Sequence, residues 1–360
     1  MAADGSLAPW LRLTLAPGVG GETQRRLLKA IGLPEAIFAA GVRALAEVVG
    51  VATAERLLAF DGAAEIGAAA TWAEAPGNRI LTLADADYPQ ALLECADPPT
   101  LIYVKGHASL LNGKSLAIVG SRNPTPQGEA NAAAFAAELA AAGLTIVSGL
   151  ALGIDAAAHR GAMRAGGHTV AVVGTGADRI YPARNRELAH AIGTQGAILS
   201  EFPLGTPPLA GNFPRRNRLI AGLSRGCLVV EAAAQSGSLI TARLAAESGR
   251  EVFAIPGSIH SPLSKGCHQL IRQGAKLVES AGDVLEELSW PSSKTVADAA
   301  PATAPVADAL LTALGHDPCT IDALAVRAGL TPDAVLAMLL QLELEGHVAS
   351  LPGGRYQRLI

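Results

Sequence analysis

Residue classes that mark several common protein types are scarce in this chain of 360 residues. Only 17% of its residues are charged while 50% are hydrophobic, which excludes a largely disordered protein. The 28 Lys and Arg residues are outnumbered by 32 Asp and Glu residues, and a histone-like polycation is therefore excluded. Any contact with nucleic acid must come from a local cluster of cations.

Cysteine and long apolar runs are also scarce. The four cysteines, Cys95, Cys227, Cys267 and Cys319, lie far apart without C-x₂-C spacing. We therefore predict no disulfide framework and no metal site. We expect no cofactor. No uninterrupted apolar run reaches the roughly 18 residues of a membrane span, and the N-terminus lacks the pattern of a signal peptide. We expect a soluble, cytoplasmic protein without a membrane contact.

Two changes in composition divide the chain. Residues 289–305 are rich in Pro, Ala and Ser without periodicity, which is typical of a tether. An Ala-rich region ends at Ala75-Pro76-Gly77-Asn78, where a strand-like segment begins. The predicted domains are a helical unit at 1–76, an α/β unit at 77–289, a linker at 290–305 and a small unit at 306–360.

The N-terminal unit is predicted to consist of short helices. Pro17-Gly18-Val19-Gly20-Gly21 precedes an apolar run and resembles the hairpin of a helix-hairpin-helix module, with a weaker copy at 49–53. Such hairpins, like helix N-termini, present backbone N–H groups to a phosphate. We therefore expect a SAM-like or helix-hairpin-helix-like domain, with an ordinary glycine-rich turn before a helix as the alternative.

The middle unit alternates short apolar runs with amphipathic stretches. The runs lie at 116–119, 144–147, 170–173, 197–199, 227–230 and 252–255, and clear amphipathic stretches lie at 129–142 and 156–165. This alternation is typical of βαβ units whose strands are buried on both faces. It predicts an α/β fold with a doubly wound, mostly parallel, Rossmann-like sheet.

Small residues follow four of these runs. They are Gly120, Ser121 and Arg122 after the first, Ser148 and Gly149 after the second, Gly174 and Gly176 after the third, and Ser236, Gly237 and Ser238 after the fifth. Because the carboxyl ends of parallel strands meet at one edge, these loops predict a phosphate-binding edge. For a single loop, glycine that merely turns the chain is an equal alternative.

The common nucleotide-binding motifs are absent. The first loop contains no G-x-G-x-x-G, and no G-x-x-x-x-G-K-[ST] occurs anywhere in the chain, which argues against NAD and ATP. Arg122 stands in this loop instead, and its guanidinium can grip a phosphate with two hydrogen bonds.

Two loops concentrate positive charge around aromatic residues. The first contains Tyr181, Arg184 and Arg186, and the second contains Phe213, Arg215, Arg216, Asn217 and Arg218. Cations that follow a phosphate backbone and rings that stack on bases are typical of single-stranded nucleic-acid binding. The alternative is a solvated helix face with aromatic residues in the core. Pro214 predicts that the second group begins a helix beside the phosphate-binding edge.

The middle unit resembles the DNA-processing protein A family, DprA or Smf, in order over residues 80 to 275. The matching motifs are Asp87-Tyr88-Pro89, Pro98-Pro99, Tyr103 to Gly106, Ala117 to Arg122, Ser148-Gly149-x-Ala151-x-Gly153-Ile154-Asp155, Tyr181-Pro182, Phe213-Pro214-x-Arg216-Asn217-Arg218, Glu231-Ala232, Ser236 to Thr241 and Val252 to Gly257. Two positions depart from the pattern: His268 stands where Asn is expected and Ala183 where Lys is frequent, so Arg184 or Arg186 would supply that charge.

This resemblance implies an extended Rossmann-like domain that binds single-stranded DNA and forms a homodimer. It further implies that the protein protects incoming strands and loads the RecA recombinase onto them during natural transformation. Carried over by position, Gly120, Ser121 and Arg122 hold a phosphate, while Arg216, Asn217 and their neighbours line the path of the strand.

The C-terminal unit is predicted to be a winged helix. Helices are expected at 306–314 and 321–328 and from a cap at Thr331 to Glu345, and a hairpin turned by Gly353-Gly354 follows. The third helix carries Asp333, Glu343 and Glu345 but no Lys or Arg. The charge of this helix therefore fits contact with a protein at least as well as contact with DNA.

An enzyme is the competing interpretation. Nucleotide N-glycoside hydrolases share Rossmann-like sheets with glycine-rich strand ends, but their Gly-Gly-x-Gly-Thr-x-x-Glu stretch is absent. The candidate bases also have structural roles available: Asp155 caps N–H groups, His159 packs or caps, and Glu231 forms an ion pair with Arg216 or Arg218. We therefore predict no catalytic residue.

Overall fold

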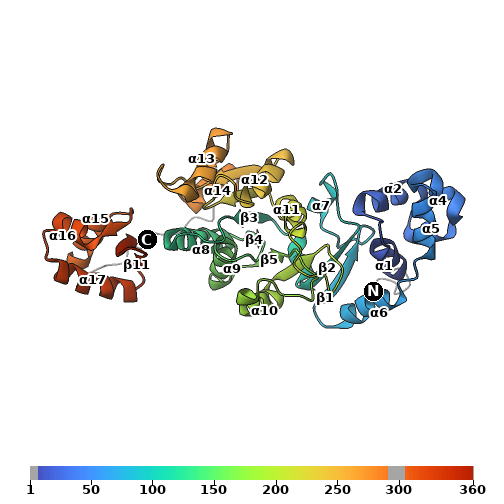
Figure 1. Cartoon of the computed structure of the whole chain (residues 1–360), viewed down its shortest axis with the longest axis horizontal. Coiled ribbons are helices and arrows are strands. Elements are labelled where there is room, and N and C mark those ends of the chain that lie inside the picture. Colours follow the sequence, from blue (N-terminus) through green and yellow to red (C-terminus); the bar gives the residue numbers. More distant parts are fainter. Residues whose placement is uncertain (1–6, 291–304, 360) are drawn as a thin grey trace.

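The N-terminal unit is a bundle of short helices at one end of the molecule (Figure 1). The computed structural model describes residues 7–290 and 305–359, so residues 291–304 of the expected linker lie outside it. The helices are α1 (Leu7–Leu15), α2 (Gly21–Ile31), α3 (Pro34–Ala39), α4 (Gly41–Val49), α5 (Val51–Ala59) and α6 (Ala63–Glu74). Leu13, Leu27, Leu45 and Leu57 form its buried core.

Both glycine-rich turns expected in this unit precede a helix. Gly20 starts α2 without a side-chain cap, and Gly50, with φ of +80°, joins α4 to α5. The unit also packs against the neighbouring sheet, because Trp10 and Trp72 share an apolar cluster with Tyr103. The helical unit is therefore joined to the next unit by a core as well as by the chain.

A sheet of nine strands forms the middle of the molecule. Its strands are β1 (Asn78–Thr82), β2 (Leu101–Gly106), β3 (Ser115–Val119), β4 (Thr145–Ser148), β5 (Thr169–Val172), β6 (Ala197–Ser200), β7 (Gly226–Val229), β8 (Glu251–Ala254) and β9 (Lys276–Leu277). Their spatial order is β1-β2-β6-β5-β4-β3-β7-β8-β9, and β3 to β9 are parallel. The chain winds from β3 first toward β6 and then, from β7, toward β9. This confirms the doubly wound sheet and places its switch point between β3 and β7.

Helices cover both faces of the sheet, as Figure 1 shows. One face packs against α8 (Pro126–Ala141), α9 (Ile154–Arg164), α10 (Arg186–Gln195) and α14 (Ala281–Glu287), and the other against α7 (Gln90–Leu93), α11 (Asn212–Leu223), α12 (Ser238–Glu247) and α13 (Lys265–Arg272). Short 3₁₀ helices are η1 (Ala108–Asn112), η2 (Ala183–Asn185) and η3 (Pro262–Ser264). Within β3, Leu116 and Ile118 face α8 while Ala117 and Val119 face α11. Burial on both faces explains why the strand runs are continuously apolar.

The C-terminal unit is a winged helix with its own core. It contains α15 (Pro305–Leu314), β10 (Cys319–Thr320), α16 (Ile321–Ala328), α17 (Pro332–Leu344), β11 (Val348–Leu351) and β12 (Arg355–Arg358). The Thr331 hydroxyl accepts the N–H of Ala334 and caps α17 as predicted. On its outer side α17 exposes Leu336, Leu340 and Leu344.

No single helix within the described residues is both long and apolar enough to span a membrane. The pair α16 and α17 would qualify together, but the chain bends by 104° between them.

Removal of residues 291–360 is expected to leave a folded protein. The fragment keeps Trp290, whose indole donates to the carbonyl of Ala142, and it loses the hydrogen bond from Gln127 to Leu359, worth about 1 kcal/mol. Thermal denaturation followed by circular dichroism should show one cooperative transition close to that of the full chain. Loss of that transition would show that the two cores depend on each other.

Candidate functional site

A pocket of about 720 Å³ lies at the carboxyl ends of β3 and β7, at the switch point of the sheet. Of the residues that the sequence placed at a binding site, it is lined by Gly120, Ser121, Arg122, Phe213, Arg216, Asn217, Ser236, Gly237 and Ser238. The structure thus brings together residues that lie up to 118 positions apart in the chain, from Gly120 to Ser238. We call this cavity the switch-point pocket.

Close packing fixes the first wall of the switch-point pocket. A Cβ atom at Gly120 would lie 2.7 Å from Cγ1 of Ile154 and 2.9 Å from the Glu231 carbonyl oxygen, so only glycine fits there. The N–H of Ser121 donates to that same carbonyl at 2.7 Å. The loop after β3 is therefore held against the end of β7, and Arg122 projects from a fixed backbone.

The role expected for Glu231 was wrong. Its carboxylate accepts the backbone N–H and the hydroxyl of Thr125 at 2.9 and 2.6 Å, instead of pairing with Arg216 or Arg218. Thr125 caps α8, so the carboxylate also lies where the helix dipole favours negative charge. Burial raises the pKa of Glu231 while these hydrogen bonds oppose the rise. The residue fastens the loop after β3.

The role expected for Arg216 also needs correction. Only 4% of this residue is exposed, and its guanidinium donates to the carbonyls of Gly149 and Val172 beneath the pocket. The nearby Asp155 carboxylate accepts the N–H groups of Gly149 and Ala151. Burial lowers the pKa of Arg216 to about 10, so it stays charged at neutral pH. It is a buried charge in the floor of the pocket instead of a surface cation.

An aromatic pair lines the pocket. The rings of Tyr181 and Phe213 lie 5.7 Å apart between centroids, and Tyr181 is 46% exposed. The Arg122 guanidinium lies 5.7 Å from the centroid of Phe213. The predicted combination of a cation with exposed ring surface is therefore present at one place.

Four predicted small residues serve packing instead of lining the pocket. Ser148 is fully buried and its hydroxyl donates to the Ile118 carbonyl. A Cβ atom at Gly174 would lie 3.0 Å from the Phe213 ring, and one at Gly176 would collide with Asp178. Gly149 likewise leaves room for the Arg216 guanidinium. These positions shape the site from below.

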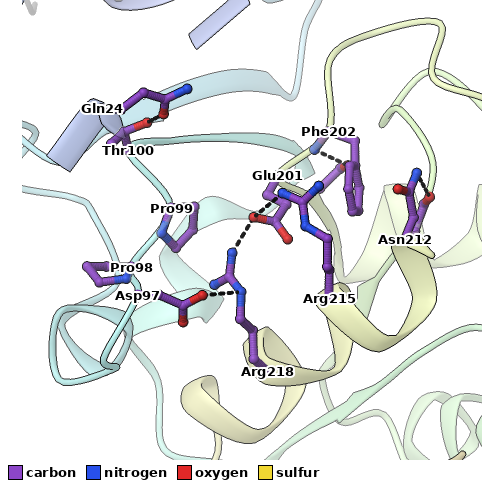
Figure 2. Close-up of polar contacts among 12 residues, drawn as sticks. Gln24, Asp97, Pro98, Pro99, Thr100, Glu201, Phe202, Asn212, Arg215 and Arg218 are labelled. Carbon is purple, nitrogen blue, oxygen red and sulfur yellow. Dashed lines mark hydrogen bonds and ion pairs between the residues drawn. The ribbon is translucent and has the colours of Figure 1, made fainter. Parts of the chain in front are cut away.

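Arg215 and Arg218 turn away from the switch-point pocket, toward the N-terminal unit (Figure 2). Arg218 forms ion pairs with Asp97, at 3.0 Å, and with the buried carboxylate of Glu201. Arg215 lies 4.0 Å from Glu201 and stacks over Phe202. Consecutive side chains on a helix point about 100° apart around its axis. Arg215 and Arg218 therefore point in other directions than Arg216 and do not reach the switch-point pocket. Arg218 is therefore engaged in an ion-pair network instead of standing free on the strand path, whereas Arg215, whose side chain is 62% exposed, stays a predicted contact of the strand.

The same network holds the loop on which the N-terminal unit docks. Gln24 in α2 accepts the Thr100 hydroxyl at 2.5 Å, and Arg25 donates to the Pro98 carbonyl at 3.0 Å. Both partners belong to the loop that Arg218 secures through Asp97. Sequence reasoning missed this contact because it joins residues more than seventy positions apart.

The remaining predicted residues have defined positions. Arg184 and Arg186 are exposed, and Arg184 lines a second cavity beside Arg122. His159 packs as expected: it is fully buried against the Thr169 hydroxyl, and burial lowers its pKa to about 3. His268, at the position where Asn was expected, makes a hydrogen bond of 3.0 Å to the Gly257 carbonyl.

Fold and pocket together define a Rossmann-like α/β protein with N–H groups, hydroxyls, an arginine and aromatic rings at its switch point, followed by a winged helix. The chain belongs to the DNA recombination-mediator protein A family, whose model matches residues 79–289. A model of the DprA winged helix domain matches residues 294–354.

Individual relatives agree with this assignment. The chain is 41% identical to Protein Smf of Escherichia coli, over 97% of this chain and 95% of that protein. It is 50% identical to the DNA processing protein DprA of Streptococcus pneumoniae, over 58% and 74%.

Two solved structures are also similar. DprA from Streptococcus pneumoniae matches with a TM-score of 0.69 at 40% identity, covering 78% of this chain and 97% of that one. DprA from Helicobacter pylori, solved to explain its single-stranded DNA binding mode, matches with a TM-score of 0.54 at 33% identity, covering 59% and 96%.

Proposed function

We propose that this protein binds single-stranded DNA in the switch-point pocket, largely without regard to sequence. The carrying observation is the placement of Arg122 on a fixed loop at the end of β3, directly beside the ring pair of Tyr181 and Phe213. A phosphate would bind the guanidinium and nearby N–H groups, and an adjoining base would stack on exposed ring surface. The Helicobacter pylori relative, which binds single-stranded DNA, supports the same ligand.

The contacts that we propose with the strand are those of residues that line the switch-point pocket. Arg122, Asn217, Ser236, Gly237 and Ser238 line the pocket and offer donors to a strand, and Phe213 supplies a ring. Arg216 contributes from the floor, where its charge raises the potential without a solvent-exposed side chain. Backbone contacts position a strand and carry no sequence information, so we expect little base preference.

The biological role that we propose is to protect incoming single strands in the cytoplasm and to load RecA onto them during natural transformation, as a homodimer. Membership of the recombination-mediator family supports this role. Titration of the purified chain with fluorescent oligo(dT), followed by RecA filament assembly on that oligonucleotide, tests both parts. Failure to bind oligo(dT) would contradict the function, whereas binding without faster filament assembly would contradict the loading role alone.

We predict that the protein turns over no nucleotide. Both carboxylate oxygens of Glu231 are engaged by Thr125, and the Asp155 carboxylate is held by two N–H groups, so neither is positioned as a free base. Incubation with AMP or ATP should release neither free base nor inorganic phosphate. Release that Glu231→Gln abolishes would favour an N-glycoside hydrolase or a phosphatase instead.

A further inference from the structure

A second cavity of about 470 Å³ adjoins the switch-point pocket, and Arg122 lines both. Two further arginines border it: Arg160 from α9, and Arg184 from η2. All three side chains are exposed. The sequence motifs did not single out Arg160, because it follows a buried histidine on an ordinary amphipathic helix. We call this cavity the arginine pocket.

Positive charge in the arginine pocket is not neutralised by the protein. Within residues 7–290 and 305–359, none of the three arginines forms an ion pair. Glu129 is the one acidic residue in the lining, and it also lacks an ion pair there. Three cations against one anion leave a net positive cavity, which concentrates anions from solution.

The backbone around the arginine pocket is held in place. Asn185 is buried and its amide donates to the carbonyls of Leu150 and Ala151, which ties η2 to the loop after β4. At Gly153, with φ of +75°, a Cβ atom would lie 2.5 Å from Pro124, so the loops after β3 and β4 are in direct contact. Arg122, Arg160 and Arg184 therefore project from three segments that are packed against one another.

We propose that the arginine pocket is a second phosphate subsite of the bound strand, and that Arg160 is one of its ligands. This inference rests on the proposed function. Arg122 lies on the border of the two cavities, so a backbone that crosses it has its bases beside Tyr181 and Phe213 and its next phosphate beside Arg160 and Arg184. The path thus runs from the switch point toward the ends of β4 and β5.

The salt dependence of oligo(dT) binding to the full chain tests this subsite. Each neutralised phosphate on a single strand contributes about 0.7 to the slope of log K against log salt. Arg160→Ala should make the negative slope of log K against log salt shallower by about that amount and reduce affinity by roughly tenfold. Arg160→Lys should keep the slope, because it keeps the charge.

Arg164→Ala is the matched control. Arg164 is exposed on the same helix but lies outside the lining of the arginine pocket, so its loss should leave slope and affinity near those of the wild type. If the wild type binds oligo(dT) but Arg160→Ala and Arg164→Ala have equal slopes, the subsite is overturned and the proposed function still stands. A wild type that does not bind oligo(dT) would overturn both.

Free phosphate is the other source of the same ligand chemistry. Thermal shift of the wild type and of Arg160→Ala with inorganic phosphate separates the two sources. A shift in the wild type that Arg160→Ala abolishes, together with unchanged oligo(dT) binding, would assign the pocket to a free anion and overturn the strand subsite. Weaker oligo(dT) binding by Arg160→Ala, without a thermal shift of the wild type by inorganic phosphate, supports the subsite for the strand.

Discussion

Replacement of Arg122 by alanine is expected to weaken oligo(dT) binding by about 2 kcal/mol, which is roughly a thirtyfold loss of affinity. Arg122 projects from a loop fixed by Gly120 and by the hydrogen bond of Ser121 to Glu231, so its guanidinium needs little ordering on binding. It also borders both cavities and stacks beside Phe213. We expect no other exposed side chain of the middle unit to have a larger effect.

Arg225→Ala provides the control for this measurement. Arg225 is also exposed, but it precedes β7 and so lies at the opposite edge of the parallel sheet. Fluorescence anisotropy should show nearly unchanged affinity for Arg225→Ala. Binding by Arg122→Ala that equals the wild type would mean that the strand does not pass the end of β3.

The largest loss of stability is expected for Arg216→Met. Arg216 and Asp155 are both buried, and their charges attract each other although the described residues show no direct ion pair between them. Loss of the Arg216 charge leaves the buried Asp155 charge uncompensated, which costs about 3 kcal/mol. Methionine keeps much of the side-chain volume, so the loss reports on charge more than on packing. Urea denaturation at neutral pH measures it.

The pH dependence of this loss has a defined sign. Burial raises the pKa of Asp155 above its ordinary value, and the Arg216 charge opposes that rise. Without Arg216 the folded-state pKa rises further. A carboxyl with a raised folded pKa stabilises the fold at low pH, and this contribution is lost as the pH increases through that pKa. The destabilisation of Arg216→Met should therefore be largest at neutral pH and shrink toward about pH 4.

Asp155→Asn combined with Arg216→Met checks the cause. The amide oxygen can still accept from Gly149 and Ala151 but carries no charge. The double variant should recover part of the stability and lose the extra pH dependence. A single variant Arg216→Met with the stability and pH profile of the wild type would show that the two charges are not coupled.

The sheet and its helices were predictable because their signals are local. The apolar run at 116–119 corresponds to β3 at Ser115–Val119, and Thr331 caps α17 as its sequence position indicates. Each of these signals depends on a few neighbouring residues whose burial or hydrogen bonding follows from their type.

The directions of side chains within the site were not predictable from such signals. Arg215, Arg216 and Arg218 read as one basic cluster, yet the helix sends one over a ring, one into the interior and one to Glu201. Glu231 pairs with Thr125 across 106 positions of sequence. Which partner a charged group meets depends on tertiary packing, and neither spacing nor composition specifies that.

Helix α11 links the binding site to the docking of the N-terminal unit. One side of it supplies Phe213 and Asn217 to the switch-point pocket, while Arg218 secures the loop on which the helical unit docks. An N-terminal unit transplanted from a homologue would therefore have to match the Asp97 to Thr100 loop as well as the apolar cluster around Trp10. Exchange of this unit between relatives would therefore also disturb helix α11 and the binding site that it lines. Chimeras should transfer the helical unit together with the Asp97 to Thr100 loop.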